Sequence, residues 1–66
     1  MYEDHDALER EWKSKGYKNL GEVNWRDEAV LAWNKSTNKE SHAIGRCYEF
    51  IILHDLKAFV TVDSSD

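Results

Sequence analysis

The chain has little of what usually staples or divides a small protein: one cysteine, no proline and three glycines among 66 residues. A single cysteine excludes an internal disulfide and is typical of a reducing compartment, so we expect a cytoplasmic protein. Without proline, repeats or low-complexity tracts there is no linker, and we predict a single domain over residues 1–66. Its ends, residues 1–4 and 63–66, are expected to fray.

Long apolar runs are missing as well. The longest run, Phe50–Leu53, is far shorter than the roughly 20 residues that a membrane-spanning helix needs. The N-terminal sequence MYEDHDALERE is acidic and has no apolar run, so a signal peptide is not expected. The formal net charge of −4 argues mildly against a general affinity for nucleic acids.

Residues that could carry chemistry are few and scattered. The candidate soft ligands are three histidines and one cysteine: His5, His42, His54 and Cys47. They lack the i, i+4 spacing on a predicted helix that helical metal motifs use. No third residue and no oxyanion loop can be named for a Cys–His nucleophile pair. The three glycines form no phosphate-binding loop. The sequence therefore predicts no enzyme, no metal site and no cofactor.

The densest apolar stretch, Ile44–Val62, must supply most of the core of so small a domain. Its runs YEFII and FVTV favour two strands that form a hairpin. A connection over residues 53–55, with the positive φ at Asp55, would place these apolar side chains on one face: Tyr48, Phe50, Ile52, Leu56, Ala58, Val60 and Val62. A two-residue connection over 54–55 would reverse the faces and bury Glu49, so the longer connection is preferred.

Two segments upstream of the hairpin predict helices. Acidic residues gather at the start of residues 6–15 and lysines at the end, with Asp6 as the capping residue and Gly16 as the left-handed stop. A second helix over about residues 25–35 is predicted from Asn24 as its N-cap, and a strand over residues 28–33 is the alternative.

The remaining segments are weakly patterned. Lys18–Val23 fits a short strand, and residues 34–39 fit a loop. The sequence Thr37–Asn38–Lys39–Glu40 also fits a capping box, which would open a helical turn over residues 38–45. The predicted fold class is therefore α+β, with two short N-terminal helices packed on a C-terminal β-hairpin in the order α-α-β-β and a possible short third strand.

Candidate partner-binding residues follow from the preferred hairpin register. Ile51, Leu53 and Phe59 would face outward as an apolar patch beside an open strand edge, unless an N-terminal segment or Lys18–Val23 folds over them. Trp33 is added because tryptophan is the residue type most enriched at binding hot spots. This surface predicts a protein partner or a homodimer through the hairpin.

The expected function is a small non-catalytic protein-binding module, an inhibitor, antitoxin-like or adaptor protein that docks on a larger partner. Its size alone suggests a phage or another mobile element as its source. The alternative is a small nucleic-acid-binding regulator, in which Lys35, Lys39 and Arg46 converge near Trp33. Thirteen acidic residues against nine basic ones leave this basic patch thin.

Overall fold

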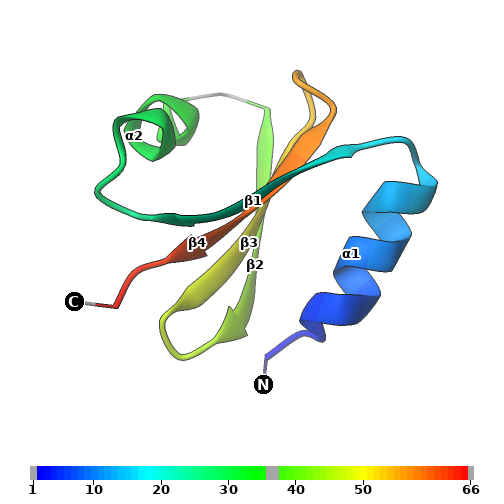
Figure 1. Cartoon of the computed structure of the whole chain (residues 1–66), viewed down its shortest axis with the longest axis horizontal. Helices are drawn as coiled ribbons and strands as arrows, with labels where there is room; N and C mark the ends of the chain where they lie inside the picture. The colour runs from blue at the N-terminus through cyan, green and yellow to red at the C-terminus, as the bar shows by residue number, and fades with distance from the viewer. Residues whose placement is uncertain (1, 36–37, 66) are drawn as a thin grey trace.

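The computed structural model describes residues 2–35 and 38–65, which form two helices and a four-stranded mixed sheet. In chain order the elements are α1 (His5–Ser14), β1 (Lys18–Asn24), α2 (Glu28–Asn34), β2 (Lys39–Gly45), β3 (Tyr48–Leu53) and β4 (Ala58–Asp63). The strands lie in the order β1-β4-β3-β2, with β1 parallel to β4 and the other neighbours antiparallel. The two helices lie on opposite sides of the sheet (Figure 1).

The predicted α-α-β-β order is wrong, because a helix, a strand and a short helix precede three strands. The weakly predicted strand at Lys18–Val23 is real and forms β1. The loop predicted over residues 34–39 holds at residues 35 and 38, whereas the helical turn predicted over residues 38–45 is wrong, because Lys39–Gly45 forms β2. Thr37, the first residue of the predicted capping box, lies outside the described residues. Both strands lie at the edges of the sheet, where few apolar residues are needed, so their sequences carry a weak strand signal.

Helix α1 begins one residue earlier than predicted, because Asp4 rather than Asp6 is its N-cap. The Oδ1 atom of Asp4 accepts hydrogen bonds from two backbone N–H groups of the first turn, at 3.0 and 3.4 Å. The predicted stop is confirmed, since Gly16 adopts the left-handed conformation with φ of 87°. Leu8 and Trp12 form the buried face of the helix.

Helix α2 is shorter than predicted, because Asp27 rather than Asn24 is its N-cap and accepts from the Ala29 N–H at 2.9 Å. Trp25, included in the predicted helix, precedes α2 and is exposed. Val30 is the buried apolar residue of α2. The alternative of a strand over residues 28–33 is wrong.

Strands β3 and β4 form the predicted hairpin, but in a different register. Leu53 pairs with Ala58, so the connection spans residues 54–57, and Lys57 rather than Asp55 takes the positive φ, at 49°. This pairing places Ile51 and Leu53 on the same face as Ala58 and the valines of β4. Glu49, whose burial argued against that arrangement, pairs with Val62 near the end of the strands and stays exposed.

Because a helix covers each face, the sheet separates two apolar clusters. The α1 cluster consists of Leu8, Trp12, Phe50, Ile52 and Phe59. The α2 cluster consists of Val30, Ile51, Leu53, Val60 and Val62. Burial on both faces explains why β3 and β4 read as nearly continuous apolar runs rather than as an alternating pattern.

Candidate functional site

The sheet has two edge strands, β1 and β2, and β2 presents the more regular edge. Strand β1 is interrupted between Asn19 and Glu22, where Gly21 has a φ of 86°. The pairing of β2 with β3 keeps one register over Lys39–Ala43. Exposed regular edges are the places where a further strand can join a sheet. We refer to Lys39–Ala43 as the β2 edge.

Alternate residues of the β2 edge turn their backbone groups away from β3. The His54 N–H donates to the Asn38 carbonyl at 3.1 Å, which makes these two residues a hydrogen-bonded pair. In an antiparallel ladder, such pairs recur at every second residue. The backbone groups of Glu40 and His42 therefore point toward β3. The residues whose backbone groups point outward are Lys39, Ser41 and Ala43.

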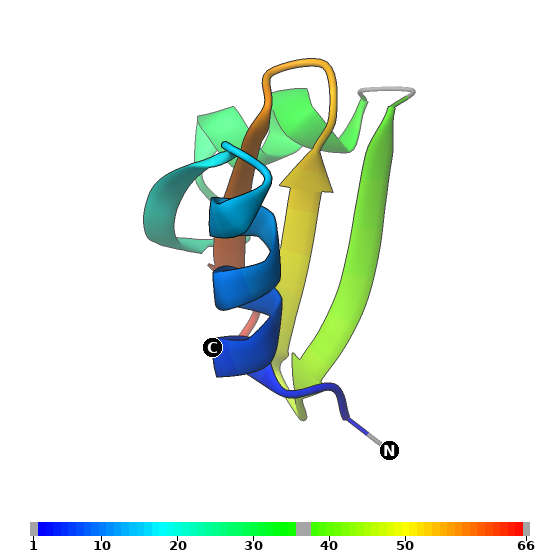
Figure 2. The same ribbon diagram turned by 90° about the vertical axis from the view of Figure 1, so that its right-hand side faces the viewer.

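The N-terminal segment crosses one end of this edge, as Figure 2 shows. The Glu3 N–H donates to the Ala43 carbonyl at 2.9 Å, and the Glu3 carboxylate accepts from Nδ1 of His42 at 2.5 Å. Both the backbone and the side chain of Glu3 thus hold the segment against β2. We call residues 2–4 the N-terminal strap, and its far end is fixed by Asp4, the cap of α1.

A chain of hydrogen bonds continues from the strap over the α1 side of the sheet. Nε2 of His42 contacts one Glu40 oxygen at 2.5 Å, and the other Glu40 oxygen contacts Nε2 of His54 at 3.2 Å. Nδ1 of His54 in turn contacts the Tyr17 hydroxyl at 3.0 Å. Because ionised carboxylates only accept, both contacts are hydrogen bonds when His42 donates from both ring nitrogens, which is its protonated form.

This arrangement shifts two pKa values. Partial burial disfavours the charged form of His42, but the hydrogen bonds to Glu40 and Glu3 outweigh it, and the pKa of His42 is raised. The hydrogen bond from His42 is the main cause that lowers the pKa of Glu40, against the opposing effect of burial. The strap is therefore held to β2 by an ion pair as well as by a backbone hydrogen bond.

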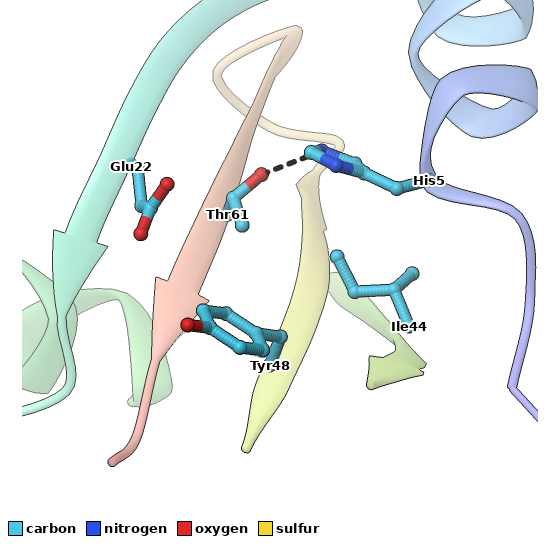
Figure 3. Close-up of a pocket in the computed structure, with 5 residues that line it drawn as sticks. All are labelled: His5, Glu22, Ile44, Tyr48 and Thr61. Atoms are coloured by element: carbon cyan, nitrogen blue, oxygen red, sulfur yellow. Dashed lines mark hydrogen bonds between the residues drawn. The ribbon is translucent and has the colours of Figure 1, made fainter. Parts of the chain in front are cut away.

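A separate cavity of about 290 Å³ lies beside the first turn of α1, and it is lined by His5 and by one residue from each strand (Figure 3). The strand residues are Glu22, Ile44, Tyr48 and Thr61. Nε2 of His5 lies 2.9 Å from the Thr61 hydroxyl and 3.2 Å from a Glu9 oxygen, so this histidine ties α1 to β4. The volume is at the lower limit of ligand pockets, which measure roughly 300–1,000 Å³.

Three of the four predicted partner-binding residues are buried. Ile51 (3% exposed) and Leu53 (0%) belong to the α2 cluster, and Phe59 (0%) belongs to the α1 cluster. The expectation that they share an outward face is wrong, because the hairpin register is shifted and helices cover both faces. Trp33 is half-buried against the α2 cluster. A role of these four residues in partner binding stays a prediction.

The other candidates from the sequence are placed as follows. Among residues 2–35 and 38–65, no three His, Cys, Asp or Glu side chains gather so that they could hold a metal ion. Cys47 lies in the β2–β3 turn, where its carbonyl accepts from the Ser64 N–H at 2.8 Å. The basic patch does not converge, because Lys39 begins β2 and Arg46 follows its other end.

The β2 edge and its polar chain escaped sequence reasoning. The positions of β2 that face α1 include Glu40 and His42, so no alternation of apolar and polar residues marks the strand. Apart from the His42–Glu40 contact, the residue pairs that form this chain of hydrogen bonds are 14, 37 and 39 positions apart in sequence. Such contacts leave no spacing to recognise. Burial alternates between exposed and half-buried residues from Ser41 to Ile44, and this alternation is recognised only once the strand is known.

Within the described ranges, neither helix has the length and apolar character needed to cross a membrane. Comparison of the chain with family models, with curated proteins and with solved structures finds no match in any of the three. The function is therefore inferred from the β2 edge, the strap and the charges beside them.

Proposed function

We propose that this protein is a small non-catalytic protein-binding module that adds a strand of a larger cytoplasmic partner to the β2 edge, as an inhibitor, an antitoxin-like protein or an adaptor. The observation that carries this proposal is the regular row of outward-facing backbone groups over Lys39–Ala43, at the end of the sheet. In strand addition, main-chain hydrogen bonds supply affinity, and alternate side chains supply specificity.

The side chains along the edge define the partner that would fit. On the α1 side a partner strand would meet Glu40 and His42, which carry opposite charges and whose side chains stay partly accessible. On the α2 side it would meet the small side chains of Ser41 and Ala43, which are exposed and leave room for larger groups. The edge therefore favours an extended segment that alternates polar or charged residues with apolar ones.

The test uses Ser41→Pro. Proline removes the N–H at the centre of the edge, and it is tolerated in edge strands where that N–H faces solvent. The variant should keep the circular dichroism spectrum of the parent chain. A partner captured from cell lysate by the parent chain, then purified, should bind Ser41→Pro at least about tenfold more weakly in calorimetry, since two or more hydrogen bonds of the added strand are disturbed.

The matched control is Leu31→Ala, which trims an exposed side chain of α2 away from the edge. This variant should bind the purified partner like the parent chain. A partner that binds Ser41→Pro as tightly as the parent chain uses another surface, and strand addition at β2 is then the wrong function.

A further inference from the structure

The N-terminal strap occupies a backbone group that an added strand would need. Ala43 is the last outward-facing residue of the β2 edge, and its carbonyl already accepts the N–H of Glu3 at 2.9 Å. The carboxylate of Glu3 lies on His42, next to the same position, at 2.5 Å. A strand paired along the whole edge must displace Glu3 from both contacts.

The shape of the edge fits a copy of itself. An antiparallel β2–β2 pair with a two-fold axis at Ser41 would place Ser41 of the two copies opposite each other and Lys39 of each copy opposite Ala43 of the other. It also places Glu40 opposite His42 of the other copy, which sets unlike charges across the interface. Moving the axis by one residue would oppose Glu40 to Glu40 or His42 to His42.

We infer that the strap keeps this chain from pairing with a second copy through β2, and that release of Glu3 from Ala43 and His42 allows an antiparallel β2–β2 dimer to form. This inference rests on the proposed use of β2 as a docking edge, and it adds the partner strand and the control of access. Natural sheets often protect an open edge by covering it, and here the cover is attached at a few atoms of one residue.

The experiment compares the dimer dissociation constants of full-length variants by analytical ultracentrifugation. Glu3→Pro removes both the N–H that bonds Ala43 and the carboxylate that bonds His42, while Asp4 still caps α1. Glu3→Lys keeps the N–H but repels His42. We expect the dimer dissociation constant to fall about tenfold or more for Glu3→Pro, which loses both contacts. It should fall less for Glu3→Lys, which loses only the contact with His42. Glu3→Lys also gives the answer should Glu3→Pro not fold.

The double variant Glu3→Pro with Ser41→Pro tests where the copies meet. It should return to the monomer, because the centre of the paired edge can no longer donate. Unchanged self-association in both Glu3 variants would overturn the inference, as would a double variant that dimerises as tightly as Glu3→Pro. Binding of a purified partner that is lost in Ser41→Pro would still support the proposed function in that case, so the two failures can be told apart.

Discussion

At the scale of single residues, His42 is the histidine whose two ring nitrogens both contact a carboxylate among the contacts described for the chain. Both of its ring nitrogens face carboxylates, from Glu3 in the strap and Glu40 on its own strand, and His54 follows behind Glu40. Its unfolded pKa is about 6.5, and the folded pKa is raised because these hydrogen bonds outweigh the cost of partial burial. The contribution of His42 to folding is therefore complete below about pH 6.5 and is lost as the pH rises through the folded pKa.

We predict that Glu3→Gln and Glu40→Gln each lower the pKa of His42, because each removes one negative charge and a charged hydrogen-bond acceptor. The measurement is the pH titration of the imidazole resonances by NMR. Glu49→Gln is the matched control, since Glu49 pairs with Ala43 on the opposite face of the sheet and should leave the His42 titration unchanged. An identical titration in Glu3→Gln and the parent chain would contradict the ion pair that holds the strap.

At the scale of elements, the start of α1 makes a sharp prediction. Asp4 accepts from two N–H groups of the first turn, whereas Asp6, the predicted cap, lies inside the helix and donates its own N–H to Asp4. Asp4→Ala should lower the free energy of unfolding by about 0.5–2 kcal/mol, because the cap is lost. Asp6→Ala loses only a favourable contact with the helix dipole, worth about 0.3–1 kcal/mol, and gains helix propensity. Its net loss should be about a few tenths of a kcal/mol at most. Urea denaturation distinguishes the two. An equal loss of unfolding free energy in the two variants would contradict Asp4 as the N-cap of α1.

Elements that depend on neighbouring residues could be predicted from the sequence. Elements that depend on contacts with distant parts of the chain could not. The stop at Gly16 and the existence of the β3–β4 hairpin follow from turn chemistry and β-branched runs, and both are confirmed. Strand β1 pairs in parallel with β4, about 40 residues further along the chain, and that pairing leaves no mark in its own polar sequence. The β2 edge pairs with the next strand in the chain, but Glu3, which covers its end, lies 39 positions before His42.

At the scale of the whole molecule, the wrong hairpin register follows from an assumption about layers. The sequence-based prediction packs both helices on one side of the hairpin. The other face would then be exposed to solvent, and Ile51, Leu53 and Phe59 would form a surface patch. The structure places α1 and α2 on opposite sides of the sheet (Figure 1). All three residues are buried. A chain of 66 residues has little apolar area to divide, and its buried apolar side chains are shared between the two faces of β3 and β4.

This arrangement makes two leucines, three positions apart, behave oppositely. Leu53 is 0% exposed in the α2 cluster, and Leu56 is 58% exposed in the β3–β4 connection, whereas the sequence-based register would bury Leu56 and expose Leu53. Leu53→Ala should lower the free energy of unfolding by about 2–5 kcal/mol, since it leaves a cavity between the sheet and α2. Domains of this size are stabilised by roughly 3–10 kcal/mol, so this loss is a large fraction of the total. Leu56→Ala carries out the same chemical change in solvent and should cost less than about 0.5 kcal/mol. Denaturant titrations of both variants decide the register: the reverse order of losses would mean that residue 52 pairs with residue 56 and that the sheet is covered on one side.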